Sequence, residues 1–248
     1  MIASPPLLGL AGLVGLVTGS YAVTGAIRWS RAEPSSAGRS HCDACGQTLG
    51  FAHTVPIASY VAARGTCRTC RAPIDPTHLV GEVAGALLIV TAVATFDPVR
   101  TPLLAVLGLT LLAAATIDWK IGRLPDVLTA GVAILSGLIA LSHSLRAAAA
   151  GAIAAVAAFL LLQGLRWLIS RKRADPGLGF GDVKLICGLA LWLGAATPWM
   201  MVGATLAGLV AMAVLRPKDG RLRFGPWLAA AAWVVGMGGE LGIWPTTL

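Results

Sequence analysis

Residues 147–165 have the sequence AAAAGAIAAVAAFLLLQGL, an unbroken stretch without a charged side chain. A helix of about 20 apolar residues is long enough to cross the hydrocarbon core of a membrane. Similar runs recur along the 248-residue chain, which is 56% hydrophobic and only 12% charged. We therefore expect an all-α fold, a polytopic membrane helix bundle with about eight transmembrane helices, near 6–27, 79–96, 99–117, 125–142, 147–169, 182–196, 198–215 and 226–244.

The basic residues orient this bundle. All but Arg100 and Arg146 of the 19 lysines and arginines fall in alternate connections or on their flanks. Those connections are 28–78, 118–124, 170–181 and 216–225. Basic residues concentrate in cytoplasmic loops of membrane proteins, so we expect a multi-pass protein of the bacterial inner membrane, surrounded by lipid. The net charge of +8 is explained by this topology, and we expect no nucleic-acid partner.

Three regions follow from the same pattern. Residues 1–27 form the first transmembrane helix, which we interpret as retained because no basic region precedes it and no small-residue cleavage site follows it. Residues 28–78 form a polar cytoplasmic loop that carries four of the five cysteines. Residues 79–248 form the remaining membrane core.

The four cysteines of the loop occur as two CxxC pairs, Cys42 with Cys45 and Cys67 with Cys70. Four thiolates at such a spacing suit a tetrahedral zinc ion, and a site filled by four sulfurs is structural because no position is open to a substrate. Two disulfides are the alternative, but disulfides rarely persist in a reducing cytoplasm. We therefore favour structural zinc, without a histidine ligand.

Three aspartates stand at the cytoplasmic ends of expected spans: Asp118, Asp126 and Asp182. Ionisable groups at the membrane are costly and suggest a function. Asp126 and Asp182 can also be explained as carboxylates that stabilise a helix start. Asp118 cannot, because it ends a helix, where the dipole disfavours negative charge.

Two carboxyl groups can hydrolyse a peptide bond when one is ionised and the other protonated. Held about 3 Å apart, they lose their protons in two separate steps. Gly179 and Gly181 would allow the backbone and an extended substrate to approach Asp182 closely. Asp118 and Asp182 are thus the candidate catalytic pair.

These residues resemble a known family. Gly179-Phe180-Gly181-Asp182 matches the GxGD motif of membrane aspartic proteases, and it follows Asp118 by 64 residues. The order of motifs along the chain is similar to that of bacterial type IV prepilin peptidases. The other shared segments are Gly19-Ser20, the double CxxC, Val55-Pro56-Ile57-Ala58-Ser59-Tyr60, Gly81-Glu82, Leu124-Pro125-Asp126 and Phe224-Gly225-Pro226-Trp227.

The resemblance implies a peptidase that removes short basic leaders from type IV prepilins or type II secretion pseudopilins. Cleavage would follow a glycine at the cytoplasmic membrane face. Asp118 and Asp182 match the catalytic aspartates, Asp126 lies outside the pair, and no metal is expected in the peptidase site. Many members also N-methylate the new amino terminus with S-adenosylmethionine, an activity associated with the cysteine-bearing loop, for which Glu82 is a candidate.

The sequence departs from the family pattern at Val23, Asp43 and His78. None of these touches the aspartate pair, but they leave open a peptidase without methyltransferase activity. A membrane transporter is a third interpretation. Transporters place their acids near span centres or in broken helices, whereas the aspartates here gather at one interface.

Overall fold

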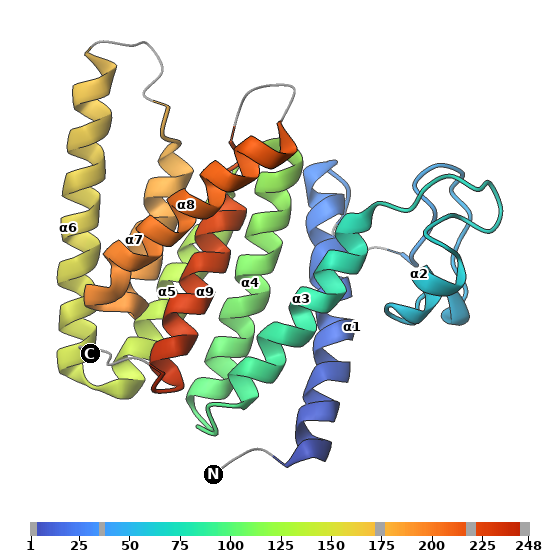
Figure 1. Cartoon of the computed structure of the whole chain (residues 1–248), viewed down its shortest axis with the longest axis horizontal. Coiled ribbons are helices and arrows are strands. Elements are labelled where there is room, and N and C mark those ends of the chain that lie inside the picture. Colours follow the sequence, from blue (N-terminus) through green and yellow to red (C-terminus); the bar gives the residue numbers. More distant parts are fainter. Residues whose placement is uncertain (1–3, 35–37, 172–176, 217–221, 244–248) are drawn as a thin grey trace.

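The computed structural model describes residues 4–34, 38–171, 177–216 and 222–243. The described chain is a bundle of long helices with a small irregular loop at one side, and no strand occurs in these ranges (Figure 1). The long helices are α1 (Pro5–Ser30), α3 (Pro76–Val93), α4 (Arg100–Ile121), α5 (Asp126–His143), α6 (Leu145–Ser170), α7 (Phe180–Leu193), α8 (Thr197–Leu215) and α9 (Gly225–Glu240). Short turns of helix are η1 (Phe51–His53), α2 (Ala58–Ala62) and η2 (Gly194–Ala196).

The all-helical, multi-pass prediction is confirmed. Six stretches of the described chain are long and apolar enough to cross a membrane. One of them runs from Phe180 to Leu215 and contains both α7 and α8. The eight runs expected from sequence correspond to the eight long helices, but α7 and α9 are short, with 14 and 16 residues. α7 ends early because Gly194 adopts a positive φ of 51°, a backbone that glycine adopts without steric cost.

Successive long helices alternate in direction, so one end of the bundle holds the four connections rich in basic residues (Figure 1). We call this the loop end, because the cysteine loop (residues 38–75) lies beside it. Arg100 and Arg146 stand at the opposite end, at the starts of α4 and α6. Segments 172–176 and 217–221, which belong to two of the basic connections, and residue 244 of the last expected span lie outside the described residues.

The two most amino-terminal long helices cross with their backbones in contact. A β-carbon added to Gly15 would lie 2.5 Å from the Gly85 carbonyl oxygen, and one added to Gly19 would lie 2.4 Å from the carbonyl oxygen of Gly81. No side chain fits there, so the glycines are what lets α1 and α3 approach this closely. This packing places Ser20 on α1 next to Glu82 on α3.

The core lies between α4, α5, α6, α7, α8 and α9, with Ala92 of α3 at its side. Its largest fully buried side chains include Leu104, Leu111, Ile139, Leu189, Trp192 and Met200. Large apolar side chains also cover the outside of the bundle, among them Leu13, Ile134, Ile153 and Leu161. Side chains of this kind on an outer surface are suited to lipid rather than water.

Candidate active site

Asp118 lies near the end of α4, and its side chain is turned into the protein, with 6% of the residue exposed. The backbone N–H of Gly225, at the start of α9, donates a hydrogen bond of 2.9 Å to its Oδ2. The unpaired N–H groups and the dipole at a helix start attract negative charge. The structure thus explains an acid at the unfavourable end of its own helix: the favourable end of another helix binds it.

Close approach to Asp118 requires a glycine at position 225. A β-carbon there would lie 2.8 Å from Oδ2 and 3.0 Å from Cβ and Cγ of Asp118. Sequence reasoning gave Gly225 no role in the site. Its only signal was the segment Phe224-Gly225-Pro226-Trp227, in which Pro226 is a favourable residue for the first turn of a helix.

Asp182 lies in the first turn of α7, where it is half-buried. The Gly179 backbone hydrogen-bonds its carboxyl group, and a β-carbon on Gly179 would lie 2.9 Å from its Oδ2. A β-carbon on Gly181 would lie 3.1 Å from Cβ of Leu124, in the connection between α4 and α5. Gly179 thus lies against the Asp182 carboxyl group, whereas Gly181 lies against the connection that follows Asp118; access for a substrate stays a prediction.

The structure brings the end of α4, with Asp118, and the start of α7, with Asp182, to the loop end of the bundle (Figure 1). Two cations act on this pair from its edges, Arg223 on Asp118 and Arg166 on Asp182. Arg166 also donates to the Leu178 carbonyl and lies over the Phe180 ring at 5.6 Å. The positive charges of the two arginines offset the repulsion between the two carboxyl groups. Acid–base chemistry with two carboxyl groups needs them held in one site.

Asp126 takes no part in this pair. Its side chain is 81% exposed and accepts a hydrogen bond of 2.7 Å from Lys184. Lys184 belongs to α7 and also lies over the Phe180 ring at 4.8 Å. Asp126 therefore links the starts of α5 and α7, which supports the segment that carries Asp182 without contacting its carboxyl group.

The four cysteines of the loop come together as the spacing predicts. Sγ atoms of Cys42, Cys45, Cys67 and Cys70 all lie within 4.8 Å of one another, and Cys42 and Cys70 are 3.8 Å apart. Four sulfurs about 2.3 Å from a tetrahedral zinc ion are separated by roughly 3.8 Å. The donor set and its size fit zinc.

Each cysteine pair sits in the same local fold, which we call a knuckle (residues 40–49 and 65–74). The N–H of Cys42 donates to Gln47 and that of Gly46 to Cys42. In the second knuckle, Cys67 donates to Ala72 and Arg71 to Cys67. One isolated bridge closes each knuckle, His41 with Thr48 and Thr66 with Pro73. Backbone N–H groups of Cys70 and Thr69 lower the pKa of Cys67 to about 6, which favours the thiolate that binds metal.

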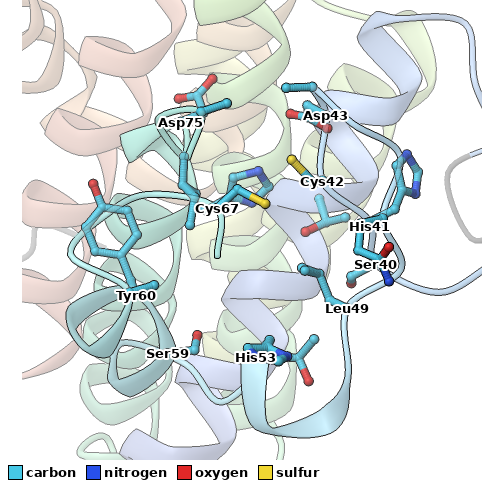
Figure 2. A pocket seen from close by; sticks show the side chains of 18 of the residues that line it. Ser40, His41, Cys42, Asp43, Leu49, His53, Ser59, Tyr60, Cys67 and Asp75 are labelled. Carbon is cyan, nitrogen blue, oxygen red and sulfur yellow. The ribbon is translucent and has the colours of Figure 1, made fainter. Parts of the chain in front are cut away.

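A cavity of about 390 Å³ separates the knuckles from α1 and α3. Figure 2 shows residues of both knuckles, such as Asp43 and Cys67, that line it together with Tyr60 and His53. Its wall also includes Glu82, which is 8% exposed. The hydroxyl of Ser20 donates to Glu82 Oε1 at 3.0 Å, and the N–H of Ile57 donates to Oε2 at 2.7 Å.

Ile57 has an unusual backbone. Its φ of 59° and ψ of −54°, with a hydrogen bond of 2.6 Å from the Ala58 N–H to the Pro56 carbonyl, form the rare strained kind of γ-turn. A β-branched residue in this conformation is costly and persists where its surroundings hold it. Glu82 holds it here, because the turn directs the Ile57 N–H at the carboxylate.

An ion pair links the wall of the cavity to α4, the helix that carries Asp118. Asp75 at the wall of the cavity pairs with Lys120, two residues after Asp118 in α4. Asp75 also caps α3 by accepting from the N–H of Thr77 at 2.9 Å. Burial acts to raise the pKa of Asp75, but the Lys120 and Thr77 hydrogen bonds hold that pKa well below its ordinary value. The carboxylate is therefore charged at neutral pH.

Together, the fold and the two sites define a polytopic membrane protein with two aspartates at one end of its helix bundle and a four-cysteine loop beside them. Residues 13–96 match the family model of the bacterial peptidase A24 N-terminal domain, and residues 105–215 match that of the type IV leader peptidase family. The chain belongs to this family. No solved structure is significantly similar to it.

Named relatives specify the family further. The prepilin leader peptidase/N-methyltransferase of Burkholderia pseudomallei is 41% identical over 207 residues, 77% of this chain and 64% of that one. The protein of the same name from Aeromonas hydrophila is 32% identical over 82% of this chain and 72% of its own. A type 4 prepilin-like proteins leader peptide-processing enzyme of Escherichia coli is 34% identical over 77% and 72%. The chain thus spans slightly under two thirds of the length of the first relatives it matches.

Proposed function

We propose that this protein is a prepilin leader peptidase in which Asp118 and Asp182 form the catalytic pair. The observation that carries the proposal is that these two carboxyl groups come from different helices to the same end of the bundle, Asp118 at the end of α4 and Asp182 at the start of α7. The ionised member takes a proton from water, which attacks the scissile carbonyl, and the protonated member donates to the carbonyl oxygen. The Gly225 N–H holds the orientation of Asp118.

The place of the pair fits a prepilin or a pseudopilin as substrate. Such a chain would have a basic leader in the cytoplasm followed at once by a hydrophobic helix in the membrane. Its scissile bond, after a glycine, would then lie at the membrane surface. The loop end carries the basic connections, so we place it at the cytoplasmic face of the inner membrane. The division into a first helix (1–27), a loop (28–78) and a core (79–248) belongs to this proposal.

We further propose that the cavity beside the knuckles binds S-adenosylmethionine, with structural zinc shaping the loop around it. When bound, this cofactor supplies a methyl group carried on a sulfonium. Glu82 provides negative charge for its cationic groups, Arg28 can complement its carboxylate, and Tyr60 offers an aromatic face. The buried Glu82 carboxylate would attract the new amino terminus and accept the proton that its nitrogen loses.

Mass spectrometry of a mature pilin from cells that carry this protein as their only leader peptidase tests both activities. We expect the leader to be removed after a glycine and the new amino terminus to gain one methyl group, 14 Da by simple mass arithmetic. A cleaved pilin without the methyl group would contradict the methyltransferase activity and support the peptidase activity only. An uncleaved pilin, with the protein present in the membrane, would contradict the peptidase.

A further inference from the structure

Far from both sites, the opposite end of the bundle contains a buried carboxylate, Glu240, the last residue of α9. Its side chain is only 1% exposed. A buried charge inside a membrane protein is costly unless partners compensate it. Neither proposed activity uses Glu240, and no motif in the sequence indicated a role for it.

Glu240 is compensated by three other helices. Oε1 accepts from Trp192 Nε1 of α7 at 3.0 Å and contacts His143 Nε2 of α5 at 2.9 Å. Oε2 accepts from Arg100 Nη1 of α4 at 3.1 Å. The 3.1 Å contact between Arg100 Nη1 and His143 Nδ1 fits the histidine tautomer that donates from Nε2 to Glu240. Asp97 pairs with the same arginine at 2.7 Å.

Two of these helices carry the proposed catalytic aspartates. Arg100 begins α4, which ends beyond Asp118, and Trp192 lies near the end of α7, which begins just before Asp182. α9 is therefore attached at both of its ends. Its first residue binds Asp118 through the Gly225 N–H, and its last residue binds α4 and α7 about 22 Å away.

Packing along α9 makes this attachment stiff. A β-carbon added to Gly236 would lie 2.2 Å from the Trp192 ring, so the tryptophan lies directly against the backbone of α9. Trp192 also contacts Trp233, with ring centroids 6.1 Å apart. A shift of α7 along α9 would break these contacts and the hydrogen bond to Glu240 together.

We propose that Glu240 is a positioning residue for peptide cleavage: by fixing α4 and α7 to α9, it sets the approach of Asp118 and Asp182. This inference rests on the proposed peptidase function. Without the ion pair at one end of α9, α7 gains freedom to rotate or slide against α4. The spacing of the two carboxyl groups at the other end then broadens. Small misplacements of catalytic groups reduce the rate steeply.

The test is the pH dependence of leader cleavage by purified full-length Glu240→Gln, with Ser142→Ala as the control. Ser142 is an exposed residue at the same end whose hydroxyl bonds only within α5. We expect Glu240→Gln to reduce kcat roughly tenfold with little change in KM. We also expect the acidic and basic limbs of the pH profile to move closer together, because coupling between two carboxyls weakens with distance. A smaller folded fraction alone would lower the amplitude and leave the limbs in place.

His143→Phe keeps a flat ring and removes the nitrogens that contact Glu240 and Arg100, so it covers the case in which Glu240→Gln fails to fold. We expect the same changes to be smaller in this variant. If both variants fold and show the same kcat and the same pH limbs as Ser142→Ala, the proposal is wrong. Asp118→Asn in the same assay separates the two claims: if it cleaves normally, the peptidase pair itself is wrong, whatever Glu240 does.

Discussion

At the scale of single residues, the Asp118 carboxyl group can lie against position 225 because glycine has no side chain there. Position 225 supplies a backbone N–H at 2.9 Å and has no side-chain atom where the carboxylate lies. An acid at the end of its own helix, near the start of another, gains the favourable field of the second helix. Asp118 therefore requires the amino-terminal end of α9 to stay within hydrogen-bonding distance.

Gly225→Ala tests this dependence. The new methyl group would lie 2.8–3.0 Å from three atoms of the Asp118 side chain, so the carboxyl group must move. We expect kcat for leader cleavage to fall by about 10²-fold, with normal membrane insertion. Gly131→Ala is the matched control, because its β-carbon would have no neighbour closer than 3.9 Å. Equal kcat values for the two variants would contradict the role given to Gly225.

At the scale of elements, the cysteine loop is built from two equivalent knuckles that meet at one set of four sulfurs. Few apolar side chains of the loop are buried; of its cysteines only Cys67 is. A small unit without a hydrophobic core depends on a metal for its fold. The loop is expected to lose its shape without zinc, while the helices keep theirs.

Removal of zinc should therefore separate the two activities. We expect Cys67→Ser to lose zinc, measured as metal per purified chain, and to lose most N-methylation while it keeps much of the leader cleavage. Cys187→Ser is the control, because Cys187 lies in α7, outside the group of four sulfurs. Purified wild-type protein without zinc, or a Cys67→Ser protein that methylates normally, would contradict this role.

The ion pair between Asp75 and Lys120 joins the loop to α4 and makes the stability of this contact depend on pH. The pKa of Asp75 is lowered in the folded protein. The stabilisation is therefore present above the ordinary aspartate pKa of about 3.9 and is lost as pH falls through the lower folded value. We expect Asp75→Asn to reduce the free energy of unfolding by about 1 kcal/mol at pH 7.

Thermal unfolding of wild type and Asp75→Asn across pH 3–7 measures this contribution. The two curves should differ at neutral pH and approach each other toward the acidic end. If the difference between the two unfolding temperatures grew as the pH fell, it would contradict this role, because a carboxylate stabilised in its charged form contributes less at low pH.

At the scale of the whole molecule, local patterns predicted most of the architecture. Apolar runs predicted the long helices. Basic residues in alternate connections predicted that these connections gather at one end of the bundle. Two CxxC pairs predicted the cluster of Cys42, Cys45, Cys67 and Cys70. These features depend on residues close together in the chain, or on composition, and are therefore visible in a sequence.

The contacts that complete the sites were not predictable in this way. Gly225 binds Asp118 across 107 residues and Arg100 binds Glu240 across 140, and no periodic pattern marks either pair. The turn at Ile57 is also invisible, because an isoleucine gives no signal for a positive φ. The positions of Asp126 at a helix start and Asp118 at a helix end were visible in the sequence, but the exposure of the first carboxylate and the burial of the second depend on packing.

The most direct test of the account is leader cleavage by three isosteric variants, Asp118→Asn, Asp182→Asn and Asp126→Asn, each purified as a full-length membrane protein. The first two remove a charge that acid–base chemistry needs, while the third alters an exposed carboxylate outside the pair. We expect Asp118→Asn and Asp182→Asn to lose cleavage, by about 10³-fold or more in kcat, and Asp126→Asn to keep most of it. Cleavage at the wild-type rate by either of the first two variants would contradict the account.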